Sequence, residues 1–390
     1  MKRSISTLIF LASILGQPAA GNVYYVSTNG DDAALGTNWG LALLTISNAL
    51  GRAVDGDEIV VSNGVFNVAT NLIVANAVNL HSLNGAESTT LYRIPVGYFR
   101  LITVTNAGAV VDGFTVMNGY ALEQGGGIYL ATGTVRRCTV VSNTAYNSFN
   151  GSSFGGGIYM TGGTVEDCLI QSNWAYASSS YGGIGYGGGI YMTRGFVRRC
   201  RLIANRTDSS YQLLYGRGGG IYTTGGTSEN CVVINNSAPS EGGGLYLNGA
   251  GSRALHCTVV SNYTWSASGG GIHLVSGAVS NSIIFHNRRS VDGKTGNVQQ
   301  PGGILAYSCT WPLNAGAGNI TGDPGFLDVT STNYSLSPGS PCIDMAATFS
   351  EITNDIEAAA RPADGDNGGG AAPDMGAWEA PPMTGGAFRC

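Results

Sequence analysis

The chain has 390 residues, a formal net charge of −5, only 11% charged residues and 61 glycines. The glycines follow no Gly-X-Y period and prolines number only 12, which excludes collagen, and a hydrophobic content of 43% excludes a disordered chain. A nucleic-acid-binding protein needs a basic face. The acidic net charge and the single lysine after residue 20, Lys294, therefore exclude that class.

Residues 1–20 have the pattern of a secretory signal peptide. Lys2 and Arg3 precede an apolar run over residues 5–15 that is too short to span a bilayer, and small residues follow it. We expect cleavage near residue 20 and a protein that is secreted or held at the cell surface or outer membrane. No later stretch is apolar enough to cross a membrane, so no transmembrane segment is expected.

Residues 21–54 are predicted to form a leading strand and an N-terminal cap. The stretch from Leu43 to Val54 is the best helical segment of the chain, and Thr45 and Ser47 are its candidate N-caps. This helix precedes a series of repeats. We expect it to cover the sheet edge of the first repeat, which would otherwise template aggregation.

Six near-identical units follow, each opening on a glycine triplet and ending in Asn. The first is GGGIYLATGTVRRCTVVSN at residue 125, and the others begin at 155, 187, 218, 242 and 269. A degenerate earlier unit, VVDGFTVMN, ends at Asn118 and places Gly113 at the Cys position. Apolar residues alternate within each unit as in short strands, and the glycine triplets forbid helices.

Units of this size cannot bury their own apolar face, but stacked units can. The sequence therefore predicts an all-β fold over residues 55–345, a right-handed parallel β-helix solenoid of roughly ten coils. Stacking turns repeat positions into an inward Ile column, a Cys column and an Asn column. The predicted members are Ile128, Ile158, Ile190, Ile221, Leu245 and Ile272; Cys138, Cys168, Cys200, Cys231, Cys257 and Ser282; and Asn118, Asn143, Asn173, Asn205, Asn236, Asn262 and Asn287.

Neighbouring strands of a sheet lie about 4.8 Å apart, so the amides of the Asn column are expected to bond from coil to coil. The glycine triplets are expected to supply positive φ or to allow close packing of one coil on the next.

The GGGI and Asn elements of residues 111–290 resemble the repeats of chlamydial polymorphic outer membrane proteins, whose motifs are GGAI and FxxN. VYYVSTNGDD, in 23–50, and DPGFLDV, in 323–346, are similar to segments of bacterial pectin-lyase-like surface proteins. NDIEAAARPADGDNGGGAAPDMGAWE, 354–379, resembles the closing segment of choice-of-anchor Q proteins. The resemblance implies a bacterial surface protein with the pectin-lyase-like fold. Residues 346–390 are predicted to form a closing segment that covers the last coil.

The Cys column lacks the His partners or C-x-x-C spacing of a metal or redox site, so we expect buried free thiols that act as small hydrophobic side chains. Cys309 and Cys342 lie outside the repeats, and in an exported protein either a disulfide or two free thiols fits them. Cys390 is then left over.

Charged pairs precede each Cys and alternate in sign from coil to coil. They are Arg136-Arg137, Glu166-Asp167, Arg198-Arg199 and Glu229-Asn230. A ladder of cross-strand salt bridges is the favoured interpretation, and an anion-binding patch is the alternative.

Catalysis on this fold requires suitably placed acidic and basic side chains. The pectate lyases that the chain resembles use Lys or Arg as base and Ca²⁺ held by clustered Asp, and the repeats contain no Asp-Asp pair. We expect no catalytic residues, with Arg198, Arg199 and Arg201 as the candidates for a lyase base. No cofactor is expected. Asp364 and Asp366 could hold Ca²⁺, but plain Asp/Gly turns are the favoured interpretation.

Aromatic residues suggest a contact surface instead. A predicted outward ladder follows the Ile column, and aromatic loops lie beside it; either the loops bury the ladder or the aromatic side chains form an exposed strip. The predicted ligand-binding residues are Tyr129, Tyr159, Tyr191, Tyr222, Tyr246, Trp174, Tyr176, Tyr181, Tyr186, Tyr211 and Tyr215.

The sequence thus predicts an exported, non-catalytic, monomeric β-helix protein that is adhesin-like or carbohydrate-binding. Its expected partner is a polysaccharide or a cell-surface glycan or protein. The alternative function is a polysaccharide lyase or glycosidase on the same fold.

Overall fold

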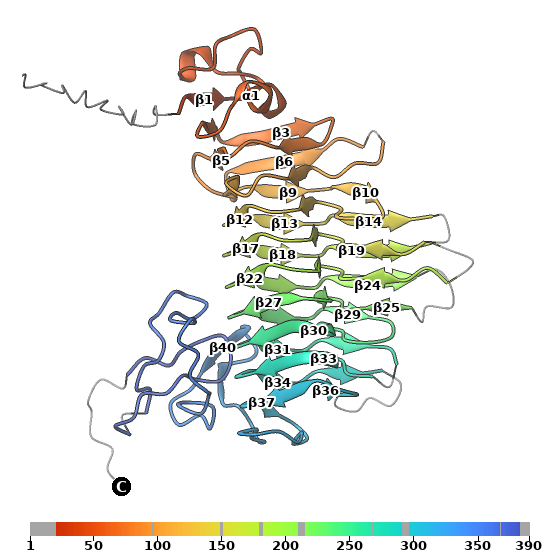
Figure 1. Cartoon of the computed structure of the whole chain (residues 1–390), viewed down its shortest axis with the longest axis vertical. Helices are drawn as coiled ribbons and strands as arrows, with labels where there is room; N and C mark the ends of the chain where they lie inside the picture. Colours follow the sequence, from red (N-terminus) through yellow and green to blue (C-terminus); the bar gives the residue numbers. More distant parts are fainter. Residues whose placement is uncertain are drawn as a thin grey trace, which may run out of the picture.

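A computed structural model describes residues 21–95, 97–148, 151–178, 182–209, 215–266, 268–290, 296–366 and 368–382. The predicted signal peptide and Cys390 lie outside the described residues. The coils stack along one long axis, with α1 (Ile46–Arg52) at one end and the last part of the chain beside the coils at the other (Figure 1). In the described part of the chain, no helix has the length and apolar character needed to cross a membrane.

The fold is the predicted right-handed parallel β-helix, with about nine turns. All pairings between coils are parallel, and the sheet that shows the stack most completely has ten strands. Apolar residues alternate with polar ones along these short strands, so each coil turns one set of side chains into a continuous core.

Three sheets, named A to C here, form the walls, and two small sheets, D and E, lie outside them. Sheet A has two strands in most coils, which form two rows, and β30 (Leu245–Leu255) and β33 (Ile272–Ser280) span both rows. The first row contains β4 (Leu72–Val74), β7 (Ile102–Val104), β11 (Ile128–Leu130), β16 (Ile158–Met160), β21 (Ile190–Met192), β26 (Ile221–Thr223) and β36 (Val298–Gln299). The second row contains β1 (Val23–Val26), β2 (Glu58–Val61), β5 (Asn79–Ser82), β8 (Val110–Asp112), β12 (Thr134–Arg136), β17 (Thr164–Glu166), β22 (Phe196–Arg198), β27 (Gly226–Glu229) and β37 (Ile304–Ala306).

Sheets B, C and D have at most one strand in each coil, and sheet E is a separate antiparallel pair. Sheet B contains β3 (Gly64–Val68), β6 (Thr89–Arg93), β9 (Thr115–Met117), β13 (Thr139–Val141), β18 (Leu169–Gln171), β23 (Arg201–Ile203), β28 (Val232–Ile234), β31 (Thr258–Val260), β34 (Ile283–Phe285) and β38 (Cys309–Thr310). Sheet C contains β10 (Tyr120–Leu122), β14 (Thr144–Asn147), β19 (Trp174–Ala177), β24 (Arg206–Ser209), β29 (Ser237–Ala238), β32 (Tyr263–Thr264) and β35 (Arg288–Arg289). Sheet D contains β15 (Ser153–Phe154), β20 (Gly185–Tyr186) and β25 (Gly216–Arg217), and sheet E contains β39 (Phe326–Asp328) and β40 (Asn333–Leu336).

The N-terminal cap is built around the predicted helix, which is shorter than the sequence pattern suggested. A 3₁₀ turn, η1 (Trp39–Leu41), precedes α1. The Thr45 hydroxyl accepts the Asn48 backbone N–H, so Thr45 is the N-cap and Ser47 lies within the first turn. The buried Ile46 packs into the core, so the helix covers the first coil as expected.

The glycine triplets serve both purposes that the sequence suggested. The first glycine has positive φ in five of the six triplets, as at Gly155 with φ +64°. A Cβ on the second, Gly156, would lie 2.4 Å from the Gly188 carbonyl oxygen of the next coil. The triplet therefore lets two coils approach closely where a side chain would hold them apart.

The Asn column forms a buried hydrogen-bonded ladder. Each side-chain oxygen accepts both the backbone N–H and the side-chain amide of the previous Asn, at 2.9–3.0 Å. The ladder continues beyond the predicted members to Asn297, which accepts from Asn287. The repeat pattern missed Asn297 because it stands where the repeats have the third glycine of the triplet, as the pairing of Ile272 with Val298 shows.

The degenerate first unit was placed one residue out of register. Thr115 pairs with Thr139, so Phe114 and not Gly113 faces Cys138. For the same reason Gly119 stands in the Asn column, and its N–H donates to Asn143. Asn118 instead adopts φ +65° and donates its side-chain amide to the Arg93 carbonyl.

The predicted Cys column is buried and its thiols are free. The Cys168 thiol donates to the carbonyl of Glu166 at 3.1 Å, and its sulfur accepts the Cys138 N–H at 3.4 Å. Burial raises the pKa of Cys168 well above the usual thiol value. These cysteines are therefore buried free thiols that fill the corner of each coil.

The C-terminal part lies on the flank of the β-helix and not over its last coil, which corrects the predicted arrangement (Figure 1). The last strand in the walls, β38, ends at Thr310, well before the predicted boundary at residue 345. Ile356 and Trp378 pack on the outward side chains of Val232 and Val260 in sheet B. Burying these apolar side chains explains why the segment lies on this face.

Buried polar contacts hold the segment in place. The Arg361 guanidinium lies 2.8 Å from the Glu379 carboxylate, and both side chains are almost fully buried. The His256 ring bonds the Asp374 carbonyl at 3.1 Å and the Asn281 side-chain amide at 2.7 Å. The flank is therefore joined to the coils by specific bonds as well as by apolar packing.

Candidate functional site

The corner residues form the predicted ladder of salt bridges. Arg136 pairs with Asp112 at 2.8 Å, Arg199 with Asp167 at 2.7 Å, and Arg198 with Glu229 at 2.6 Å. Asp112, which the sequence reasoning left out, starts the ladder and also bonds Arg137. Because the positive charges are paired with carboxylates within the ladder, little unpaired positive charge remains for the alternative, an anion-binding patch.

The three candidates for a lyase base are all engaged. Arg198 and Arg199 belong to the salt-bridge ladder, and the bond to Asp167 raises the pKa of Arg199 further. Arg201 lies 3.4 Å from Glu357 and over the Trp378 ring, both in the C-terminal segment. Each of the three guanidinium groups therefore has a carboxylate partner.

The tyrosine ladder of sheet A is stacked as predicted. Adjacent rings have centroids 4.8–5.5 Å apart, and the ladder ends on His273. Sheet D covers part of it, because Phe154 and Tyr186 meet the ladder rings edge-on. Tyr222 and Tyr246 are each only 5% exposed.

Burial also raises the pKa of Tyr191 and Tyr246 to about 12. The covered part of the ladder therefore packs the β-helix and offers almost no surface to a ligand. Tyr129, Tyr159 and Tyr191, towards the other end of the ladder, keep partly exposed side chains.

The loop residues named from the sequence fall into three groups. Trp174 and Tyr176 lie on β19 in sheet C, and Tyr186 lies on β20, where it covers the ladder. Tyr215 is 40% exposed. Tyr181 and Tyr211 lie outside the described residues.

Sheet C carries a second row of aromatic rings on its outer face. Tyr98, Tyr120, Tyr146 and Tyr176 follow one another from coil to coil, with centroids 5.5–5.7 Å apart. Trp174 stacks on Tyr176 at 4.5 Å, and Arg206 lies 3.9 Å from the Trp174 ring. We call Tyr98, Tyr120, Tyr146, Tyr176 and Trp174 the tyrosine strip.

Sequence reasoning placed Tyr146 and Tyr176 in loops and did not connect them. A signal was present, because each lies three residues after an Asn of the buried ladder, Asn143 or Asn173. Parallel register then places Tyr146 beside Tyr176. Tyr98 and Tyr120 belong to the degenerate coils, where no repeat motif marks them.

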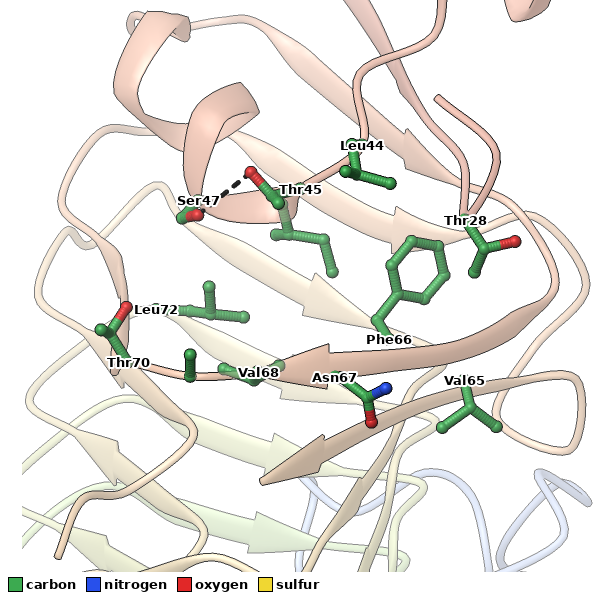
Figure 2. Close-up of a pocket in the computed structure, with 12 residues that line it drawn as sticks. Thr28, Leu44, Thr45, Ser47, Val65, Phe66, Asn67, Val68, Thr70 and Leu72 are labelled. Carbon is green, nitrogen blue, oxygen red and sulfur yellow. Dashed lines mark hydrogen bonds between the residues drawn. The ribbon is translucent and has the colours of Figure 1, made fainter. Parts of the chain in front are cut away.

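An apolar pocket of about 340 Å³ opens beside the N-terminal cap (Figure 2). It lies between the start of α1 and strand β3, with Leu44 and Val65 at 43% and 58% exposure and the buried Phe66 at its wall. Its lining includes no ionisable side chain. The pocket therefore has no group that could act as an acid, a base or a metal ligand of the usual carboxylate or imidazole type.

Three carboxylates gather in the C-terminal segment. Asp364 and Asp366, named from the sequence, are joined by Asp344, and one oxygen of each lies within 4.8 Å of the others. Backbone N–H groups of Ala372, Gly369 and Gly368 donate to these carboxylates. Such bonds are typical of Asp turns and account for the arrangement without a cation.

Comparisons with known proteins agree with this architecture. Residues 100–289 match the family model described as a right-handed β-helix region. The crystal structure of pectate lyase Pel9A superposes with a TM-score of 0.52 at 12% identity, covering 93% of this chain and 97% of that one. A rhamnogalacturonan lyase gives a TM-score of 0.44 at 11% identity, covering 85% and 97%. No curated protein sequence matches.

These findings define the class of protein. The chain has a right-handed parallel β-helix fold, and pectate lyase Pel9A is one solved structure with that fold. At 12% identity the likeness shows the fold alone. The finer resemblances to polymorphic outer membrane proteins and choice-of-anchor Q proteins stay predictions.

Proposed function

We propose that the protein is an exported, non-catalytic β-helix protein that binds a polysaccharide along the tyrosine strip. The observation that carries the proposal is the continuity of the strip, since its rings follow one another across successive coils at 5.5–5.7 Å. Tyr98 is 62% exposed, and Tyr120, Tyr146 and Tyr176 are half-buried, so the rings are held in place and still reach the surface.

The chemistry of sugars suits such a surface. Pyranose rings have flat C–H faces that pack on aromatic rings, and each tyrosine hydroxyl adds a hydrogen-bonding group. A polymer that lies along the strip would contact several rings at once, so individually weak contacts would sum through multivalency. An adhesin-like role at the cell surface follows if the polymer belongs to another cell.

Catalysis is a weaker account of the same fold. The likeness to a pectate lyase concerns the chain path, and Arg198, Arg199 and Arg201 are each held by a carboxylate. A binding role needs only the exposed rings. The proposal therefore retains a polysaccharide as partner and assigns no reaction.

The test is affinity electrophoresis of residues 21–390 through gels that contain single polysaccharides, neutral and acidic. We expect a retarded band with at least one polymer, and a roughly tenfold or greater loss of affinity in the Tyr146→Ala/Tyr176→Ala double variant. Trp265→Ala, which removes a ring 38% exposed outside the strip, is the matched control.

Retardation that survives in the double variant, or falls equally in the Trp265→Ala control, would place the contact surface elsewhere. Cell fractionation of the native host with an antibody against the protein tests export. A soluble cytoplasmic pool as the only form would contradict that part of the proposal.

A further inference from the structure

Arg100 differs from the arginines of the salt-bridge ladder. Arg100 lies just before β7 of sheet A, and its guanidinium lies 5.1 Å from the centre of the Tyr129 ring. Among the described residues no carboxylate forms an ion pair with it, whereas Arg136, Arg199 and Arg217 each have one. Arg100 is also half-buried, so its charge is partly removed from water without a counter-charge.

Arg100 lines a pocket of about 320 Å³ at the Tyr98 end of the tyrosine strip. Tyr98, Phe99 and Leu122 form apolar walls, and Asn71 and Thr103 contribute polar groups. The Asn71 and Thr103 side chains bond each other at 2.9 Å. Arg100 is thus the one charged residue in the lining of a pocket that opens beside the strip.

A second arginine lies close by. Arg93 is 6% exposed, with its guanidinium 5.7 Å from the Tyr120 ring and 5.5 Å from the Phe99 ring. It donates to the backbone carbonyls of Asn118 and Gly97 and, within the described chain, forms no ion pair with an acid. This end of the strip is therefore positive in a protein whose formal net charge is −5.

We infer that the pocket binds an anionic group, a carboxylate or a sulfate, carried by an acidic polysaccharide that lies along the tyrosine strip. The inference rests on the proposed function and names the class of polymer. A guanidinium presents a planar fork of donors that fits either oxyanion. Burial lowers the pKa of Arg100, and an anion in the pocket would restore the stabilisation that its charge has lost.

The experiment compares neutral polymers with acidic ones. Dextran and dextran sulfate differ by sulfate, and galactan and polygalacturonate provide a neutral and a carboxylated polymer. Dissociation constants are measured by affinity electrophoresis at low and high salt for the wild type, Arg100→Gln, Arg100→Lys and Arg194→Gln. Arg194 is an exposed arginine in another coil, so its variant loses the same charge away from the pocket.

We expect Arg100→Gln to weaken binding of the acidic polymer by roughly tenfold or more, because a charge-assisted bond is lost. The affinity of Arg100→Gln for neutral polymers and the affinity of the Arg194→Gln control for acidic polymers should change little. The salt dependence of acidic-polymer binding should decrease in Arg100→Gln. Arg100→Lys keeps the charge but lacks the planar fork of donors, so its affinity for the acidic polymer should lie between those of the wild type and Arg100→Gln. Which acidic polymer binds identifies sulfate or carboxylate as the group.

Three outcomes would overturn the inference, and they can be distinguished from one another. If Arg100→Gln leaves acidic binding unchanged while Tyr146→Ala/Tyr176→Ala abolishes it, the strip binds polysaccharide and the pocket does not select an anion. If Arg100→Gln weakens the binding of neutral and acidic polymers equally, Arg100 acts by positioning the Tyr129 ring and not by binding an anion. If no polymer binds the wild type, the inference and the proposed function both fail.

Discussion

The buried Asn ladder gives the sharpest prediction about stability. Asn205 is fully buried and makes four side-chain hydrogen bonds. It donates to the Ile170 carbonyl and to Asn236, and it accepts the backbone N–H and the side-chain amide of Asn173. In Asn205→Ala the Asn173 side chain keeps its bond to the Val140 carbonyl, but the Asn173 N–H loses its partner.

A buried donor without a partner costs about 1–3 kcal/mol, and each other bond contributes about 1 kcal/mol. We therefore expect Asn205→Ala to lower the free energy of unfolding by roughly 4–6 kcal/mol, measured by urea denaturation. Asn84→Ala, which removes an exposed amide bonded only to Asn63, should cost less than about 1 kcal/mol. A loss below about 1 kcal/mol in Asn205→Ala would show that the ladder does not stabilise the coils.

Three further predictions concern pH, redox state and catalysis. Burial holds the pKa of His256 well below its ordinary 6.5, so below that pH the unfolded chain takes up a proton that the folded chain does not. Relative to His256→Gln, the unfolding free energy should therefore fall between pH 7 and pH 5, while burial raises the pKa of Asp374 to about 7 and acts in the opposite direction in both proteins; an equal change in the two proteins would contradict the prediction. Cys309 in β38 and Cys342 in the C-terminal part lie within hydrogen-bonding reach, and oxidised glutathione should join them while two molecules of reduced glutathione are released. The closed loop should stabilise the chain by about 3–4 kcal/mol, as judged by denaturation with and without reductant; full alkylation of both thiols after oxidation would refute this. No unsaturated product should form from pectate or alginate; turnover that disappears in Arg199→Ala would overturn the non-catalytic account.

Much of the fold could be predicted because its determinants are local and periodic. The glycine triplets, the Ile and Cys columns and the Asn ladder recur in each coil, and parallel stacking turns recurrence into contact. The degenerate coil was misplaced by one residue because its register was counted back from Asn118, whereas Gly119 occupies the Asn column. The Arg–acid alternation likewise sufficed to predict the salt bridges.

The C-terminal segment and the tyrosine strip could not be derived in the same way. The flank position depends on apolar side chains such as Val232 and Val260 that point outward, a feature visible only once the register is known. The covered ladder and the exposed strip both consist of regularly spaced tyrosines. Only the path of sheet D decides that Tyr246 is buried while Tyr146 reaches the surface.

The central claim is that polysaccharide binds along the tyrosine strip. Tyrosine iodination followed by mass spectrometry tests this claim most directly. The wild-type protein is iodinated with and without the polysaccharide that retards it most. We predict that Tyr98, Tyr120, Tyr146 and Tyr176 lose reactivity when the polymer is bound, while Tyr307, 38% exposed and distant in sequence from the strip, keeps its reactivity. Unchanged iodination of the four strip tyrosines in the presence of bound polymer would contradict the claim.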